Sequence, residues 1–153
     1  MTGPPLLFYE DMEPGVELTS PPETIDQDDL VKFAHTWDPL PFHFDEEAGR
    51  KAFGGITAPG LYMLAVKQRL VHSLPPQAVI ASLGYDEVRF KEPLRPGDTV
   101  FLKQLWESRR PSGSKTDRGI VTLRFSLVNQ SGAIVLTHLD TVLVRRRQAA
   151  GQD

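Results

Sequence analysis

The chain has 153 residues, which suits one folded domain around a single hydrophobic core. Its formal net charge of −3 and pI near 5.8 argue against a nucleic-acid partner, and the lack of cysteine excludes disulfides, thiolate metal sites and cysteine nucleophiles. No apolar run approaches the length of a membrane-spanning helix. The N-terminus lacks the basic start and apolar run of a signal peptide, so we expect a cytoplasmic protein with no membrane association.

The first helix is predicted from a capping signal and an apolar face. Residues 1–12 are rich in proline and predict an extended lead-in. A helix is expected over residues 24–38, with Thr24 as the N-cap and Gln27 completing a capping box. Apolar residues recur along it at helical spacing, and Pro39 ends it.

The second helix differs from the first because it is apolar on every side. An irregular passage over residues 38–58 precedes it, in which Asp45 is expected to cap a short helical turn. The helix itself is predicted over residues 59–74, where proline suits the first turn. Because residues 61–66 are all apolar, we expect the first turns to be enclosed by the rest of the chain.

The second half of the chain predicts a meander of long strands. Four runs show alternation and β-branched residues, at residues 79–90, 98–108, 119–130 and 133–144. Their connections are rich in turn residues and fit antiparallel hairpins. The sequence therefore predicts an α+β domain, spanning residues 1–153, in which an antiparallel sheet curls around one buried helix. Residues 146–153 are expected to form a frayed, solvated tail.

The segment "DPLPFHFD", residues 38–45, holds the candidate chemistry. Its two prolines stiffen a short passage that carries an acid and a histidine. One interpretation is structural: Asp38 caps a turn before Pro39, and His43 is a half-buried loop residue. The other is catalytic, because histidine transfers protons near neutral pH and an adjacent carboxylate can share a proton with it.

The longer segment "DPLPFHFDEEAGRKAFGGITAPG" resembles the signature of MaoC-like (R)-specific enoyl-CoA hydratases and dehydratases, which have the hot-dog fold. In order and spacing, the matches to the family's acid-to-histidine element are Asp38, Pro41, His43 and Asp45. Gly60 matches the glycine that opens the family's central helix, and "VRFKEPLRPGDTV" resembles its later strand-turn-strand. Two positions depart from the pattern: Leu40 stands where the family has asparagine, and Pro59 where it often has histidine.

The resemblance implies a hydro-lyase that acts on an acyl-CoA or acyl-carrier-protein thioester. Asp38 and His43 would be the acid-base pair, and the backbone N–H of Gly60 would stabilise enolate charge on the thioester oxygen. Leu61, Met63 and Leu64 are first of all core residues, and line the acyl pocket only by resemblance.

Several other polar residues have structural interpretations. Lys91, with Arg89 and Arg95, is a candidate for binding phosphate groups of the thioester carrier, but a solvated strand edge is the favoured explanation because no glycine-rich phosphate loop accompanies these cations. Three further histidines show no metal-ligand spacing: His35, His72 and His138. Neither a metal nor a redox cofactor is expected.

Three functional classes remain open from the sequence. The first is the hydratase or dehydratase. The second is an acyl-thioester hydrolase on the same fold, which the order of the acid, proline and histidine disfavours. The third is a catalytically silent acyl-binding or partner subunit, which the departures at Leu40 and Pro59 keep open. The resemblance also implies a homodimer whose sheets join edge to edge.

Overall fold

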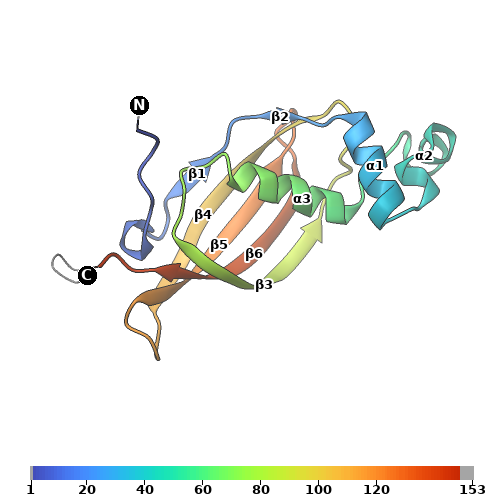
Figure 1. Cartoon of the computed structure of the whole chain (residues 1–153). Coiled ribbons are helices and arrows are strands. Elements are labelled where there is room, and N and C mark those ends of the chain that lie inside the picture. The colour runs from blue at the N-terminus through green and yellow to red at the C-terminus, as the bar shows by residue number, and fades with distance from the viewer. Residues whose placement is uncertain (1, 149–153) are drawn as a thin grey trace.

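The computed structural model describes residues 2–148 and places a long sheet around one helix (Figure 1). The helical elements are η1 (Tyr9–Asp11), α1 (Gln27–Trp37), η2 (Pro41–His43), α2 (Glu46–Phe53) and α3 (Gly60–Val71). The strands are β1 (Glu17–Thr19), β2 (Glu23–Thr24), β3 (Val79–Phe90), β4 (Thr99–Pro111), β5 (Arg118–Val128) and β6 (Ile134–Arg145).

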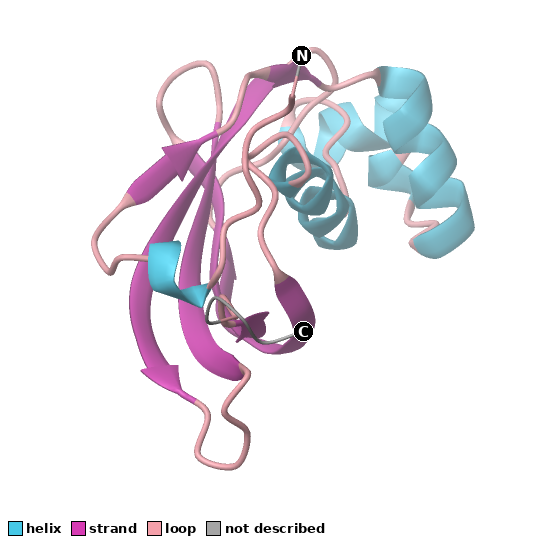
Figure 2. Ribbon diagram, turned by 60° about the vertical axis from the view of Figure 1, so that its left-hand side comes forward, coloured by secondary structure: helices cyan, strands magenta, loops and turns pink. Residues whose placement is uncertain are grey.

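The described strands form one antiparallel sheet of six strands in the order β1-β4-β5-β6-β3, with the short β2 also pairing with β4. In β5 the buried and half-buried residues alternate, as its sequence predicts. Figure 2 shows the α-helices gathered on one side of this curved sheet, with the short η1 apart from them. The expected α+β hot-dog arrangement, a sheet wrapped around a central helix, is therefore confirmed.

The central helix α3 is buried along one face only, which corrects the expectation that its apolar first turns are enclosed on every side: Leu61 and Ala65 are exposed in the single chain. Tyr62, Met63, Val66 and Leu70 are all buried and belong to the main hydrophobic core. Lys67 is buried with them, with no exposed surface at all. A lysine inside the core is a feature that the apolar pattern does not explain.

The start of α1 differs from the prediction. Thr24 does not cap the helix, because it lies in β2, paired with Thr99 of β4, and its hydroxyl bonds to the Thr99 hydroxyl at 3.2 Å. Asp26 is the N-cap instead, and its carboxylate accepts the N–H of Asp29 at 3.0 Å. Thr24, which the local sequence pattern predicts as the N-cap, is thus paired in a strand and the helix begins two residues later than predicted.

The passage between α1 and α3 is more ordered than expected. It holds one turn of 3-10 helix, η2, and the two-turn helix α2. The predicted cap at Asp45 is confirmed, because its carboxylate accepts the N–H of Ala48 at 2.8 Å. Gly54 ends α2 in the left-handed conformation with φ of 75°.

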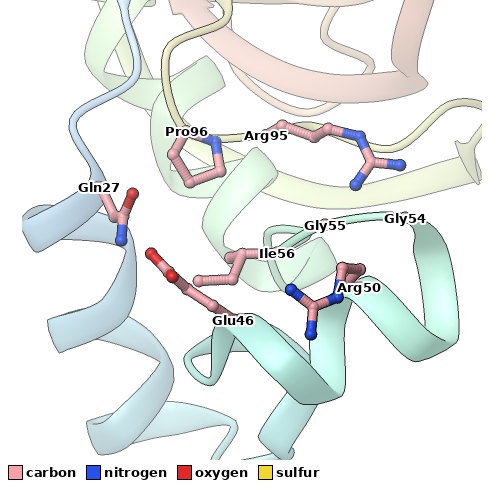
Figure 3. A pocket seen from close by; sticks show the side chains of 8 residues that line it. All are labelled: Gln27, Glu46, Arg50, Gly54, Gly55, Ile56, Arg95 and Pro96. Atoms are coloured by element: carbon pink, nitrogen blue, oxygen red, sulfur yellow. The ribbon is translucent and has the colours of Figure 1, made fainter.

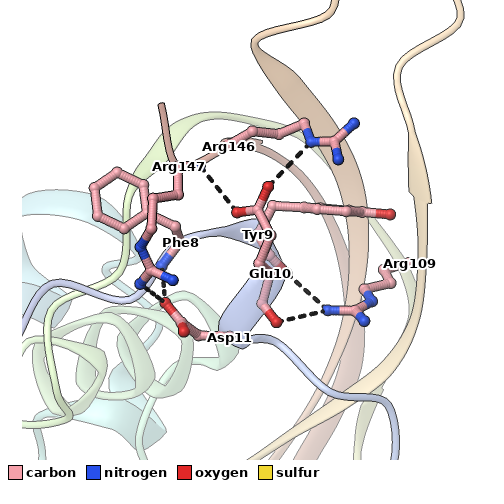
Figure 4. Close-up of polar contacts among 7 residues, drawn as sticks. All are labelled: Phe8, Tyr9, Glu10, Asp11, Arg109, Arg146 and Arg147. Atoms are coloured by element: carbon pink, nitrogen blue, oxygen red, sulfur yellow. Dashed lines mark hydrogen bonds and ion pairs between the residues drawn. The ribbon is translucent and has the colours of Figure 1, made fainter. Parts of the chain in front are cut away.

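The two ends of the described chain bind each other, which corrects both terminal predictions (Figure 4). The lead-in turns into η1, where Tyr9 is buried. Beyond β6, Arg146 pairs with Glu10 at 3.1 Å and Arg147 with Asp11 at 2.6 Å. The hydrogen bond from the Phe8 N–H, together with Arg147, holds the pKa of Asp11 below its usual value. The first residues of the expected frayed tail are thus anchored; residues 149–153 lie outside the described part.

Strand β3 is the open edge of the sheet. It pairs with β6 on one side, and no other strand within residues 2–148 pairs with its outer side. Most of β3 is exposed in a single chain, including these apolar or aromatic residues: Val79, Ile80, Leu83, Tyr85 and Phe90. Among the described helices, none is long and apolar enough to cross a membrane.

Candidate active site

Asp38 and His43 lie side by side at the end of α1. Asp38 is the C-cap of the helix, where its N–H donates to the Ala34 carbonyl at 2.9 Å. The chain then turns through η2, with Pro41 at its start, and the His43 Nε2 comes within 3.3 Å of the Asp38 Oδ2. The histidine side chain is 8% exposed and the aspartate side chain 33% exposed. The two side chains that the sequence predicts as a pair therefore lie next to each other. The His43 ring is buried and the Asp38 carboxylate is partly exposed.

The orientation of the His43 ring is fixed by a backbone carbonyl. Its Nδ1 lies 2.6 Å from the carbonyl oxygen of Thr57. A carbonyl oxygen only accepts, so Nδ1 carries a hydrogen and donates it. The neutral ring then presents the Nε2 lone pair toward Asp38, and one proton placed on either partner joins the two. This is a pair that can take up and release a proton at Nε2.

The loop that carries the pair is held by Phe42 and by its own backbone. The Phe42 ring meets the His43 ring at 4.4 Å and the Phe53 ring of α2 at 5.2 Å, both edge to face. The His43 N–H donates to the Leu40 carbonyl at 2.9 Å. The Leu40 side chain is largely exposed, as is Trp37, which is 67% exposed and is not a support for the loop.

Helix α1 is tied to α3, which places the pair beside the start of α3. The Tyr62 hydroxyl on α3 donates to the Asp29 carboxylate at 2.8 Å, and the Phe33 and Tyr62 rings meet edge to face at 5.3 Å. Burial, together with the hydrogen bond to Asp29, raises the pKa of Tyr62. The hydroxyl therefore stays a donor at neutral pH, and the tie is kept.

Gly60 is the first residue of α3 and is required by close packing. A Cβ added there would lie 2.6–2.9 Å from atoms of the Phe90 ring, so a larger residue fits only if this half-exposed ring moves. The first N–H groups of a helix have no acceptor within the helix, and the positive end of the helix dipole lies there. Gly60 thus offers a backbone donor at the junction of α3 and β3.

The other predicted binding residues separate into two groups. A shallow cavity of about 240 Å³ brings Met63 and Lys91 together beside Thr57. Leu64 is half-buried and packs against the core. Leu61 is 55% exposed and does not line this cavity in the single chain.

A second shallow cavity, of about 340 Å³, lies between α2 and the β3–β4 connection and contains two arginines (Figure 3). Arg95 donates to the Phe53 carbonyl, and its Nη1 is a buried donor for which the described residues provide no acceptor. Arg50 and Glu46 lie on the opposite wall. Arg89 and Lys91 are not part of it, so the three candidate phosphate-binding cations do not form one site. Residues 2–148 contain no group of three side chains suited to hold a metal ion.

Sequence reasoning missed Thr57, whose carbonyl fixes the His43 ring. A backbone carbonyl is present at every residue, so no residue type marks it. The glycine-rich passage before α3 was the available signal, since it brings that backbone back to the loop: the Thr57 N–H also donates to the Phe42 carbonyl at 3.4 Å.

The structure is a hot-dog domain in which the Asp38–His43 pair lies near the start of the central helix. The chain belongs to the MaoC-like family, because the family model described as "MaoC like domain" matches residues 11–127. It is similar in structure to a MaoC-like dehydratase from Rhodospirillum rubrum, with 35% identity and a TM-score of 0.87 over 94% of this chain and 99% of that one.

Two relatives by sequence show the same domain in different lengths of chain. The uncharacterized protein YdeM of Bacillus subtilis is 30% identical over 125 residues, which cover 80% of this chain and 87% of YdeM. Protein MaoC of Klebsiella aerogenes is 32% identical over 98 residues, which cover 63% of this chain but only 29% of MaoC. The present chain thus spans less than a third of MaoC and most of YdeM.

Proposed function

We propose that this protein is a hydratase or dehydratase that adds water to, or removes it from, a 2-enoyl or 3-hydroxyacyl thioester of CoA or acyl-carrier protein. The observation that carries the proposal is the His43 ring, anchored through Nδ1 on Thr57 and facing Asp38 through Nε2 at 3.3 Å. Membership of the MaoC-like family and the likeness to a protein described as a dehydratase support the same reaction class.

In this proposal the pair moves the protons of the reaction. During hydration, the oxygen of water bonds to the β-carbon while the Asp38–His43 pair takes one of its protons. A proton then goes to the α-carbon, and the negative charge that collects meanwhile on the thioester oxygen is stabilised by the Gly60 N–H. Dehydration is the reverse, and the protein is regenerated unchanged. The cytoplasmic location expected from the sequence fits substrates of this kind.

The substrate-binding roles follow from the same arrangement. Met63 and Leu64 would contact the acyl group along α3, and Leu61 would do so only if a second chain covers it. Lys91 would lie at the mouth of the shallow cavity, where a cation suits a phosphate-bearing carrier.

A homodimer joined through β3 is part of the proposal. This edge is twelve residues long and exposed on both faces, and an unprotected apolar edge promotes association. Phe90 from this strand packs on Gly60, so a second chain paired with β3 would also border the start of α3. The exposed apolar residues near the site are candidates for the same interface: Trp37, Leu40, Phe53 and Leu61.

The test follows enoyl-thioester absorbance and free thiol in parallel, over acyl-CoAs of increasing length. We expect the conjugated absorbance to change without thiol release. Asp38→Asn should abolish this change, whereas Asp28→Asn, a matched exposed change on α1, should leave it intact. Thiol release would instead identify a hydrolase, and neither signal on any thioester would identify a silent binding subunit.

A further inference from the structure

A cluster of polar side chains surrounds the buried Lys67 on the inner face of the sheet. The Lys67 Nζ donates to the Tyr85 hydroxyl oxygen at 3.0 Å and to the Gln68 side-chain oxygen at 3.2 Å. It also lies 4.5 Å from the centre of the Tyr85 ring and 4.8 Å from that of Phe125. A buried ammonium group is costly unless its surroundings stabilise it, so this lysine needs an explanation other than packing.

The partners of Lys67 line the largest of the cavities described, about 770 Å³ in volume, between the second half of α3 and strands β3 to β6. Gln68 and Tyr85 are on its wall, together with Ser82 and Asp140 and with apolar residues such as Val71. Lys67 stands directly behind them. The cavity is therefore amphipathic: it has an apolar body with a group of polar residues in its wall.

The hydrogen bonds of this wall leave both donors and acceptors free for a ligand. The Tyr85 oxygen accepts from Lys67, which leaves its own O–H to donate, and the Gln68 oxygen does the same, which leaves its NH2 group. The Ser82 hydroxyl donates to one oxygen of Asp140 at 2.5 Å, and the second carboxylate oxygen remains an acceptor.

His138 adds one more unused acceptor behind Tyr85. Its ring stacks on the Tyr85 ring at 4.4 Å, and its Nδ1 donates to the Leu139 carbonyl at 3.0 Å. Burial lowers the pKa of His138, so the ring is neutral and Nε2 is an acceptor. Within residues 2–148 this buried Nε2 has no hydrogen-bond partner.

The charges around the cavity select among polar ligands. Lys67 contributes one positive charge and the buried Asp140 one negative charge, so the wall is close to neutral overall. Asp140 lines the cavity, whereas Lys67 stands behind the wall and already donates to Tyr85 and Gln68. A carboxylate entering the cavity would therefore meet the Asp140 carboxylate first and be repelled, and a plain alkyl chain would leave the donors unpaired. A hydroxyl group both donates and accepts, and satisfies the two kinds of free site at once.

The cavity is in line with the candidate active site along α3. Gly60, Leu64, Lys67 and Val71 are spaced by four, three and four residues, which places them on one stripe of the helix. Lys67 is seven residues beyond Gly60, roughly 10 Å along the helix axis. The stripe therefore runs from Gly60 to Val71, which lines the cavity.

We propose that this cavity binds the far end of the acyl chain and selects substrates that carry a neutral hydroxyl group there. This inference rests on the proposed function, because it takes the thioester to lie at Gly60. Tyr85 and Gln68 are its contact residues, and Lys67 is a positioning residue that orients both.

The test compares three 2-enoyl-CoA series of matched chain length, with a terminal hydroxyl, a terminal methyl or a terminal carboxylate. We expect wild-type kcat/KM to be highest for the hydroxyl series. Tyr85→Phe should reduce the hydroxyl-to-methyl preference by about five- to tenfold, the range of one lost hydrogen bond. Tyr9→Phe, a matched change in η1 away from the cavity, should leave the preference unchanged. Lys67→Met should lower it in the same direction as Tyr85→Phe.

The outcomes separate this inference from the proposed function. Equal turnover of all three series, or a preference for the carboxylate, would overturn the hydroxyl assignment while leaving the hydratase proposal intact. If no series is turned over, calorimetry can measure the binding of saturated acyl-CoAs that end in a hydroxyl or a methyl group. Their relative affinities then test the cavity assignment. Tighter binding of the former that Tyr85→Phe removes supports the cavity assignment, and equal binding rejects it.

Discussion

Replacing Lys67 with methionine removes a buried charge while keeping an unbranched side chain of similar length. Burial lowers the pKa of Lys67 from 10.5 to about 8 in the folded chain, against an opposing attraction from Asp140. Between these two values the unfolded chain binds more protons than the folded one, so stability rises with pH across this window. Below it, where both states are protonated, the charged lysine costs the fold about 3 kcal/mol.

The pH dependence of the unfolding free energy can be measured over a narrower pH range. From pH 7 to pH 9.5, linkage predicts that wild type gains about 2 kcal/mol of unfolding free energy relative to Lys67→Met. The titratable neighbours that face Lys67 are Tyr85, Asp140 and His138. Burial raises the pKa of Tyr85 above its usual value.

Urea unfolding at four pH values in this range would measure the difference, with all proteins at one concentration because association would add to stability. Lys32→Met, an exposed change on α1, is the matched control and should follow wild type in parallel. A gap between wild type and Lys67→Met that is the same at every pH would refute the assignment of a lowered pKa to this lysine.

Three further outcomes are expected. Asp38→Asn and His43→Ala should each reduce kcat/KM by about 100- to 10,000-fold, and the double variant should be scarcely worse than either; additive losses would argue against one acting pair. The stability loss should stay within about 1 kcal/mol for the partly exposed Asp38 and reach about 1–3 kcal/mol for the buried His43. Light scattering at micromolar concentration should give twice the 17.1 kDa chain mass, and a monomer that still hydrates enoyl thioesters would contradict the β3 interface. Leu40→Asn should change the rate by less than about tenfold, ~1.4 kcal/mol, whereas activity gained by an inert protein would mean that asparagine is needed.

The fold was predictable because its signals are local and repeated. The long strands show period-two alternation over many residues, and the apolar first turns of α3 required a surrounding sheet. The cap of α1 was not predictable in the same way. Thr24 and Asp26 are both good N-caps, and what decided between them was the pairing of Thr24 with Thr99, a residue far along the chain.

The site was predictable to the same extent. The prolines and the spacing of Asp38 and His43 marked the pair, but not the Thr57 carbonyl that orients it, since only the fold brings that backbone close. The burial of Lys67 did have a signal in the sequence. It lies four residues after Met63 and four before Val71, on the enclosed face of α3.

Leu40 shows why a departure from the family pattern need not disable the loop. Its backbone carbonyl accepts the N–H of His43, and its own N–H donates to the Asp38 carbonyl at 2.8 Å, so this position joins the two residues of the pair through the main chain. Any residue except proline can make those two bonds. The side chain is 46% exposed and is not part of the Phe42 packing that supports the ring of His43. An asparagine here would add a polar group beside the pair, but the geometry of the pair is already set by the backbone, by Pro41 and by the Thr57 carbonyl. In the proposed function, the polar contacts to the acyl group lie elsewhere, along α3, where the chain places Lys67 rather than another apolar residue.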